Sequence, residues 1–304
     1  MTNVEVVSFG GWRKCVRLWN REIEVIVTTQ VGPRVIRCGF IGGPNEFHVF
    51  ERELGQLSGT QFTLYGGHRL WIAPEQRPRT YHPDNQKVTW APGDTFVSFK
   101  APSESTTGIQ KELRLSIART ENCVAVTHVL TNHTPFALSL AAWAVTIMAP
   151  GGRALLPQEP HHPHPARLAP ARPLVLWPYT DMTDARWSWG KKYIQFRHDP
   201  QIKGSQKIGA LNSHGWIAYV NLDRLFVKRF PYLLEATYPD FNSNVELYGD
   251  EEFVELESLS PLRQLHPGES LTHEERWYLF QRVDIGRTDA DIDRSLKPYL
   301  ASTS

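Results

Sequence analysis

The sequence predicts an all-β protein built from many short strands. Three observations lead to this fold class: β-rich runs bounded by turn residues recur along the chain, segments with a 3.6-residue hydrophobic period are almost absent, and 304 residues suffice for one large β domain. The clearest predicted strands span residues 22–29, 35–40, 95–100, 113–118, 124–130, 136–148, 216–220 and 225–230. We therefore expect a single domain over residues 1–304.

Two local signals add detail to this pattern. Residues 221–224, Asn-Leu-Asp-Arg, have the composition of a tight hairpin loop, so the flanking strands are expected to pair antiparallel. Near the carboxyl end, Thr288 and Asp291 have capping-box spacing, and apolar residues recur every four positions from Ile292 to Leu300. This segment is predicted to form a helix on the outside of the sheets.

Residues 149–173 are rich in proline and lack any periodicity, which predicts a long surface connector rather than a strand. His161, His162 and His164 lie within it, but the surrounding prolines hold that stretch extended and no cysteine or helix supports a ligand set. We expect a mobile loop without a transition metal.

Composition excludes several classes of protein. The net charge is only +1, so the chain does not have the excess of basic residues that nucleic-acid binding requires. The sequence contains no run of 18 consecutive apolar residues, so no membrane-spanning helix is predicted. The amino-terminal residues lack a signal-peptide pattern, so the protein is predicted to be cytoplasmic. Cys15, Cys38 and Cys123 have neither metal nor redox spacing and are predicted to be buried free thiols. No cofactor is expected.

Aromatic residues are abundant, with ten Trp, ten Tyr and fourteen Phe, and several of them stand beside polar residues. A pyranose ring has an apolar C–H face and a rim of hydroxyls, so its binding sites combine flat aromatic surfaces with a few fixed polar groups. This composition is typical of a sugar site, although aromatic residues used only as sandwich core would give the same counts.

The segment 65–75, YGGHRLWIAPE, is the first candidate site. Its two glycines let the backbone approach a ligand closely, while His68 titrates near neutrality, Arg69 is a permanent cation and Trp71 offers a stacking face. The alternatives are a structural hydrogen bond for His68 and an ion pair between Arg69 and Glu75.

The segment 238–259 is the second candidate site. Strand alternation places Asn242, Asn244, Glu246 and Tyr248 on one face, and Glu255 and Glu257 on one face of the next strand. A two-residue loop at 249–250 would set Asn244 opposite Glu255 and Asn242 opposite Glu257, whereas a four-residue loop would set Glu246 opposite Glu255. Either register predicts a shared face of carboxylates and amides, for which a solvated outer face is the alternative.

Two sets of motifs resemble a known group of proteins. LESL at 256–259, LHPGES at 265–270 and EERWYL at 274–279 resemble the carboxy-terminal pattern of aldose 1-epimerases and related galactose mutarotase-like proteins. GGHRLWIAPE at 66–75, YHPDN at 81–85, WPYTD at 177–181, HGW at 214–216, LFVKRF at 225–230 and YPD at 238–240 are similar to the DUF4380 family, a branch of that superfamily. The resemblance implies a β-supersandwich of mostly antiparallel strands that binds a carbohydrate.

The resemblance also implies a mechanism. In mutarotases a glutamate takes the proton of the anomeric hydroxyl and a histidine protonates the ring oxygen, so that the ring opens and recloses as the other anomer. Glu257 matches the catalytic glutamate, with Glu255 as second choice. Where mutarotases carry the histidine, this chain has Trp143, which donates a hydrogen bond but transfers no proton at neutral pH. His68 is the provisional acid.

Other residues in these motifs are candidate sugar contacts. They are Arg69, Trp71, Trp143, Trp177, Tyr179, Trp216, Lys228, Asp240, Asn242, Glu246 and Glu255. Lys207, like Arg186 and His214, fits either a ligand contact or a structural ion pair. Lys207, Lys228 and Arg69 together would suit an anionic sugar, such as a phosphorylated or uronic one.

Three functions fit these features. The first is a sugar mutarotase or epimerase with Glu257 as base and His68 as acid. The second, favoured by Trp143, is a non-catalytic carbohydrate-binding or regulatory protein, and the third is glycoside hydrolysis with Glu75 or Glu246 across a sugar from Glu257. We expect an open cleft lined by His68, Arg69, Trp143, Trp177, Trp216, Glu246 and Glu257.

Overall fold

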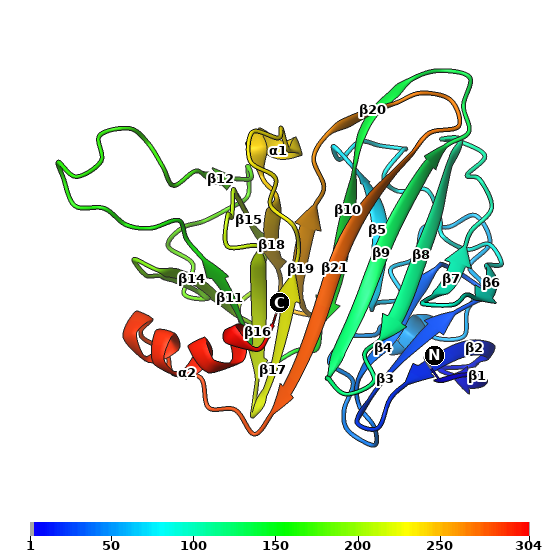
Figure 1. Ribbon diagram of the computed structural model, residues 1–304, viewed down its shortest axis with the longest axis horizontal. Coiled ribbons are helices and arrows are strands. Elements are labelled where there is room, and N and C mark those ends of the chain that lie inside the picture. Colours follow the sequence, from blue (N-terminus) through cyan, green and yellow to red (C-terminus); the bar gives the residue numbers. More distant parts are fainter. Residues whose placement is uncertain (1–2, 304) are drawn as a thin grey trace.

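The computed structural model describes residues 3–303 and consists of two large antiparallel β-sheets (Figure 1). The first, of eleven strands, has the order β1 (Asn3–Phe9), β2 (Trp12–Trp19), β3 (Ile23–Thr28), β4 (Arg34–Phe40), β5 (His68–Ala73), β10 (Leu138–Met148), β19 (Val254–Leu259), β18 (Val245–Gly249), β15 (Gln206–Ala210) and β12 (Leu174–Leu176), with β20 (Arg263–Leu265) paired to β10. The second, of ten strands, has the order β13 (Trp187–Trp189), β14 (Tyr193–Arg197), β11 (Arg153–Pro157), β16 (Trp216–Asn221), β17 (Arg224–Arg229), β21 (Ser270–Gln281), β9 (Cys123–Asn132), β8 (Ile109–Ile117), β7 (Val97–Lys100) and β6 (Thr89–Pro92). The predicted all-β fold class is confirmed.

One continuous cluster of buried apolar side chains holds the two sheets together. Leu70 and Leu256 contribute to it from the first sheet, and Leu115, Phe226 and Trp277 from the second. Because side chains alternate along a strand, residues adjacent to these core positions point to the opposite face of the first sheet. Packing between the sheets therefore fixes which residues reach that outer face.

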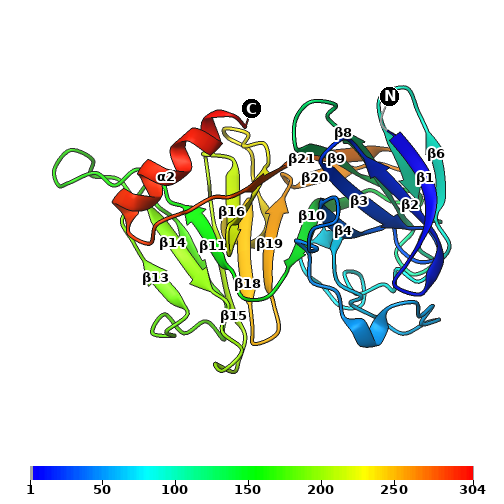
Figure 2. The same ribbon diagram turned by 90° about the horizontal axis from the view of Figure 1, so that it is seen from below.

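Both local signals of the sequence are confirmed. Asn221 pairs with Arg224, so β16 and β17 form an antiparallel hairpin with a two-residue loop. The helix α2 (Asp289–Ala301) begins after Thr288, whose hydroxyl accepts a bond from Asp291 N. It covers the second sheet from outside, as Figure 2 shows, and its Ile292 is buried in a cluster with residues of β11, β16 and β17. Within residues 3–303, no helix is long and apolar enough to cross a membrane.

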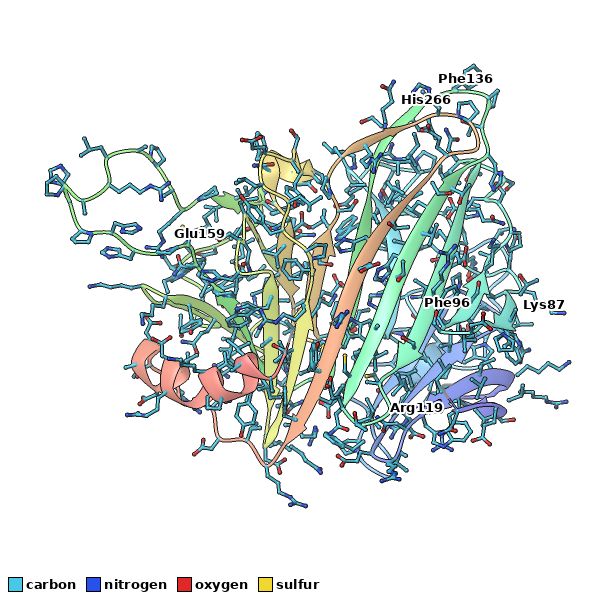
Figure 3. The ribbon with its side chains drawn as sticks, viewed as in Figure 1. Lys87, Phe96, Arg119, Phe136, Glu159 and His266 are labelled. Carbon is cyan, nitrogen blue, oxygen red and sulfur yellow. The ribbon has the colours of Figure 1, made fainter. Side chains whose placement is uncertain are left out.

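The proline-rich connector lies between β11 and β12 and projects from the body of the molecule (Figure 1). Residues 160–170 are all exposed. Glu159, labelled in Figure 3 beside the start of this loop, accepts bonds from the backbone N and the hydroxyl of Ser213 at 2.7 and 2.9 Å. Figure 3 also labels Phe136, which is 70% exposed, and His266, both of which lie near β20.

The pairing of β18 with β19 differs from both predicted registers. Glu246 lies opposite Glu257 and Tyr248 opposite Glu255. The strands are joined by residues 250–253, where the Asp250 side chain accepts bonds from the backbone N of Glu252 and Phe253. Glu246 was expected opposite Glu255 in the four-residue alternative, so the observed register is shifted by two residues. Because side chains alternate with a period of two, this shift keeps the carboxyl groups on the predicted shared face.

Asn242 and Asn244 do not belong to that strand, contrary to the prediction. Asn242 lies in the short turn α1 (Pro239–Asn242), where its side chain accepts a bond from the backbone N of Tyr238. Asn244 is fully buried and exchanges hydrogen bonds with the backbone of Asn212. Both amides hold loops in place, since each is already bonded to nearby backbone groups. The remaining helical element is the 3-10 turn η1 (Glu51–Glu53).

Candidate functional site

Five neighbouring strands of the first sheet follow one another in the order β5, β10, β19, β18 and β15 (Figure 1). They bring polar residues together on the outer face of that sheet. Val145 lies opposite both Arg69 and Glu257, and Glu257 lies opposite Glu246. Residues opposite one another on paired strands share a face, so Arg69, Glu257 and Glu246 follow one line across the sheet. The sheet thus assembles residues that are almost 190 positions apart in sequence.

The centre of this face is the Lys207 cluster, which we define as Lys207, Glu246, Glu257 and Trp143. Lys207 Nζ lies 2.7 Å from Glu246 Oε2 and 2.9 Å from Glu257 Oε2. The same ammonium lies 4.6 Å from the centre of the Trp143 ring, within cation–π range. Burial by itself would lower the pKa of Lys207, but the two glutamates raise it well above its ordinary value. Lys207 is therefore a permanent ammonium that binds two carboxyl groups together.

The two oxygens of Glu257 have different surroundings. Oε2 accepts a 2.6 Å hydrogen bond from Trp143 Nε1 and a 2.9 Å bond from Lys207 Nζ. Oε1 is buried and has no hydrogen-bond partner among residues 3–303. Buried polar atoms are nearly always hydrogen-bonded in native proteins, so Oε1 can accept a donor that residues 3–303 do not supply. Glu257 is thus held through one oxygen and free to accept a proton through the other.

Two donors on the same face also lack partners. Arg69 contacts Glu255 Oε1 through Nη2 at 3.4 Å and lies over the Trp71 ring at 4.1 Å, but its Nε and Nη1 make no hydrogen bond within the described chain. Trp71 Nε1 is likewise buried and unpartnered. Together with Glu257 Oε1 they form a set of donors and an acceptor that matches sugar hydroxyls, which both donate and accept.

Glu255, the second choice for the base, lies beside Arg69 on the same face. Burial, followed by repulsion from Glu257, raises the pKa of Glu255 to about 7, against the opposing effect of Arg69. Its carboxyl group is therefore poised between its two protonation states at neutral pH. Because Glu255 pairs with Arg69 and lies two residues from Glu257, it adds charge to the same site.

Aromatic rings surround these polar groups. Trp71 contacts Trp143 edge-to-face with ring centres 5.1 Å apart, and Tyr81 lies 5.4 Å from Trp71. The centre of the Trp177 ring lies 4.8 Å from Lys207 Nζ. Tyr179, near these groups, is 46% exposed. Burial raises its pKa to about 12, with Lys207 opposing the shift and Glu257 reinforcing it. The combination of flat rings and fixed polar atoms is typical of sugar sites.

Asp240 joins the cluster from the turn α1. Burial raises the pKa of its carboxyl group, whereas Glu246 and the charge of Lys207 act to lower it. Burial also raises the pKa of Glu246 well above its ordinary value, with Lys207 opposing and Glu257 and Asp240 reinforcing the shift. Burial and repulsion between neighbouring carboxylates both favour the protonated form, which is the direction of these two shifts.

The site is covered, which differs from the predicted open cleft. Glu246 and Glu257 are both 0% exposed. One surface cavity of about 870 Å³ lies beside His48 and His198, and another of about 530 Å³ beside Trp216, and neither is lined by any residue of the Lys207 cluster. The carboxyl groups of Glu246 and Glu257 are therefore enclosed by the protein in this structure.

His68 lies on the opposite face of the sheet, which corrects its prediction as the acid. It is adjacent to Arg69 on β5, so the two side chains point to opposite faces. His68 is fully buried between the sheets, where Thr146 Oγ1 bonds its Nδ1 at 2.8 Å and His128 Nε2 lies 2.7 Å from its Nε2. Burial lowers its pKa well below the ordinary value. A neutral, enclosed imidazole on that side of the sheet has no access to a sugar at Glu257.

Lys228 and Trp216 are also placed away from the Lys207 cluster. Lys228 is buried between the sheets, with Glu275 Oε1 at 2.9 Å and the carbonyl of Leu256 at 2.9 Å. Trp216 packs in the cluster beneath α2, on the outer side of the second sheet. Both belong to strands of the second sheet, whose side chains cannot cross the first sheet to its outer face.

The interior histidines are the group that could hold a metal. His68, His128 and Glu275 have ligand atoms within 4.8 Å of one another. Their hydrogen-bonding capacity is already used, since His128 Nδ1 donates to the His273 carbonyl and Glu275 accepts bonds from Lys228, Ser258 and Trp277. The donor set therefore fits a hydrogen-bonded polar network, in which the Lys228 ammonium takes the place of a cation.

Lys207 is the residue that sequence reasoning undervalued. It was one of several possible ion-pair members, yet it is buried and connects Glu246 to Glu257. The signal was present in the sequence as a single lysine within the otherwise uncharged strand β15 (Gln206–Ala210). Only the pairing of β15 with β18 shows which carboxylates it meets.

Comparison with solved structures identifies the fold. A galactose mutarotase-like protein from Lactobacillus casei superposes with a TM-score of 0.57 at 10% identity, covering 88% of this chain and 100% of that one. Another from Clostridium acetobutylicum gives 0.57 at 11%, covering 92% and 99%. The fold is that of the galactose mutarotase-like proteins. A TPR-domain containing protein from Parabacteroides distasonis gives 0.57 at 15% over 90% of this chain, which spans about half of that protein at 48%.

No family model matches the chain, and no curated protein matches it in sequence. The galactose mutarotase-like fold is therefore established by structure, while membership in the DUF4380 family remains a prediction. Of the sequence motifs, GGHRLWIAPE and LESL lie on β5 and β19 of this face, and they carry the unpartnered atoms of Arg69, Trp71 and Glu257. The motifs HGW, LFVKRF and EERWYL lie on β16, β17 and β21 of the second sheet.

Proposed function

We propose that the protein binds a monosaccharide over Glu257 and interconverts its anomers by general acid–base catalysis. The observation that carries this proposal is the asymmetry of Glu257: Oε2 is held by Trp143 and Lys207, while the buried Oε1 has no partner in residues 3–303. A base needs a free oxygen in a fixed position, and two donors on the other oxygen supply that fixation. The mutarotase-like fold supports the same class of chemistry.

Trp143 has a positioning role in this scheme. Its indole cannot supply a proton at neutral pH, but its N–H orients the carboxylate of Glu257. Arg69 and Trp71 present the unpartnered donors for sugar hydroxyls, and the Trp71 ring offers an apolar surface for the sugar.

A neutral sugar fits this face better than an anionic one. The three cations that suggested an anionic sugar are each paired: Lys207 with two glutamates, Arg69 with Glu255, and Lys228 with Glu275 in the interior. Adding a phosphate or carboxylate would place it beside Glu255 and Glu257, at an electrostatic cost.

Anomer exchange measured by NMR on neutral, phosphorylated and uronic sugars tests the proposal. Glu257→Gln retains the shape and hydrogen-bonding capacity of the side chain without acting as a base, so exchange should fall about a hundred- to ten-thousand-fold. Glu274→Gln, an exposed glutamate on β21, is the matched control and should leave the rate unchanged. Full activity in Glu257→Gln would show that Glu257 is not the base, and Glu255 would be the next residue to test.

A non-catalytic sugar-binding protein is the second candidate, favoured by the tryptophan at position 143. It predicts a specific outcome of the same experiment: a sugar that binds, seen as a change in tryptophan fluorescence, while its anomer exchange stays at the rate of the buffer. That result would retain the site and remove the catalytic step.

A further inference from the structure

The HGW motif faces a cavity on the outer side of the second sheet, away from the Lys207 cluster. This HGW cavity has a volume of about 530 Å³, within the range of about 300–1,000 Å³ that is typical of small-ligand sites. The start of the proline-rich connector, the turn at residues 190–192 and the helix α2 surround it. His214 and Trp216 both line it. A motif that the first site leaves unused therefore has a cavity of its own.

Trp216 offers this cavity a hydrogen-bond donor. The residue is only 5% exposed, and its ring packs against Tyr193 with ring centres 6.2 Å apart. Its backbone carbonyl accepts a hydrogen bond, but its indole Nε1–H donates to no group within residues 3–303. Buried indole N–H groups usually have a partner. An accepting group in the cavity would supply the one that is missing.

His214 offers an acceptor from the same motif. Its Nε2 lies 3.1 Å from the carbonyl oxygen of Gln158, and because a carbonyl only accepts, Nε2 carries the proton of this bond. In the neutral ring the other nitrogen, Nδ1, is then an acceptor, and the described part of the chain gives it no donor. A ligand that suits this cavity must therefore donate as well as accept.

Buried hydrogen bonds fix the backbone of the motif. The fully buried Asn212 accepts at Oδ1 from the backbone N of His214 and Gly215, at 2.9 and 3.2 Å. Its Nδ2 donates to the carbonyl of Trp216 at 2.8 Å. Gly215 has a φ of 63°, and a Cβ at this position would lie 2.6 Å from the carbonyl oxygen of Phe230. The donor and the acceptor are thus held in place by their own backbone, which favours binding because little order remains to be imposed.

The carboxyl groups of the cavity are already engaged. The two oxygens of Glu159, labelled in Figure 3, accept bonds from the backbone N and the hydroxyl of Ser213. The two oxygens of Asp293 accept a 2.7 Å bond from the Tyr193 hydroxyl and a bond from the Lys192 ammonium. Neither carboxylate has a free oxygen in a fixed position, as a general base needs. The cavity is therefore equipped to bind a ligand but not to transform it.

We propose that the HGW cavity is a second, non-catalytic site for a sugar unit, in which Trp216 Nε1 donates to a hydroxyl oxygen and His214 Nδ1 accepts from a hydroxyl. A hydroxyl group both donates and accepts, so a sugar satisfies both atoms, whereas a carboxylate satisfies only the indole and a hydrocarbon satisfies neither. Pro157, Pro160 and Leu300 supply apolar lining for the C–H face of the ring. This site is independent of the reaction proposed for the first sheet.

Methyl glycosides are the probes that test this proposal, because they lack the free anomeric hydroxyl on which the proposed base, Glu257, would act. We would titrate the methyl glycosides of glucose, galactose, mannose and xylose into isotope-labelled protein and follow the indole N–H resonances by NMR. The resonance that disappears in Trp216→Phe belongs to Trp216, and it should shift saturably with at least one glycoside. The backbone amide of Gly215 then reports affinity in the variants. Trp216→Phe and His214→Ala should each weaken binding about two- to ten-fold, and Trp90→Phe, on the edge strand β6, should leave it unchanged.

The proposal fails if no glycoside shifts the Trp216 resonance up to the solubility of the sugars. It also fails if cyclohexanecarboxylate, an anion of similar size, shifts this resonance at lower concentration than every glycoside, since the cavity would then select an anion. Equal affinity in the parent protein, Trp216→Phe and His214→Ala would overturn the roles of the two side chains. Thermal unfolding shows whether Trp216→Phe is folded, and His214→Ala, at an exposed position, tests the same site without disturbing the core.

Anomer exchange separates this site from the proposed function. Glu257→Gln should lose exchange and keep the glycoside-dependent shift of the Trp216 resonance. Trp216→Phe should keep exchange at the parent rate. If Trp216→Phe loses exchange while it remains folded, the two sites are not independent and the second-site proposal is overturned.

Discussion

Trp143 Nε1 and Lys207 Nζ bind the same oxygen of Glu257, at 2.6 and 2.9 Å, and leave the other oxygen unpartnered. The tryptophan at a position where mutarotases are expected to carry a histidine therefore contacts the proposed base directly. Trp143 departs from the expected motif, but its N–H holds the carboxylate of Glu257 in place.

Removing the indole donor should weaken both stability and catalysis. Trp143→Phe keeps an aromatic ring but removes a hydrogen bond to a buried carboxylate, so the free energy of unfolding should fall by about 1.5–3 kcal/mol. Urea denaturation measures this loss. Trp90→Phe, a half-buried tryptophan on β6, is the comparison and should cost less. Equal losses in the two variants would show that the bond to Glu257 adds nothing beyond packing.

Removing the central cation should be more costly. Lys207→Met leaves Glu246 and Glu257 buried without their shared partner, and breaking a buried ion pair from one side costs about 3–5 kcal/mol. Lys203→Met provides the exposed control, because its contact with Glu251 is on the surface and worth about 0–1 kcal/mol. Adding Glu246→Gln to Lys207→Met should recover part of the loss. If the double variant is no more stable than Lys207→Met, the two side chains do not interact energetically.

The interior histidines should make the protein sensitive to acid. Burial lowers the pKa of His128 and His68, and it lowers that of His273 to about 3. In the unfolded chain these groups bind protons below about pH 6.5 while the folded state does not, so stability declines as the pH falls from about 6.5 towards 3. Each such histidine adds about 1.4 kcal/mol per pH unit to the slope within that window.

Denaturation at a series of pH values tests this dependence. His273→Gln should reduce the slope between pH 6 and about 4, whereas His162→Gln, in the exposed connector, should leave it unchanged. An unchanged slope in His273→Gln would mean that the carboxylates alone govern acid unfolding.

Sugar charge should decide affinity. Because Arg69 and Lys207 are already paired with carboxylates, neutral monosaccharides should bind more tightly than their phosphorylated or uronic counterparts. Titration followed by tryptophan fluorescence gives the dissociation constants, and Glu255→Gln should narrow the difference by removing one negative charge. Tighter binding of the phosphorylated sugar would indicate that Arg69 exchanges Glu255 for the ligand.

Much of the fold follows from the sequence by itself. Alternation and turn composition located the strands, the 221–224 hairpin and the helix after Thr288, because each depends on interactions between residues close in sequence. The shared face of Glu246 and Glu257 was predictable for the same reason. A period of two survives a register shift of two residues, although the register itself depended on how Asp250 caps its loop.

The site was decided by tertiary structure. Sequence motifs treat His68 and Arg69 as one unit, but alternation sends Arg69 to the outer face and His68 between the sheets, and only the packing of the second sheet determines which face is which. Lys207 meets Glu257 because β18 lies between their strands, β15 and β19. The sequence indicated which residues have suitable chemistry for a site. It did not predict which of them meet, because contacts between distant strands depend on long-range pairing that no local pattern encodes.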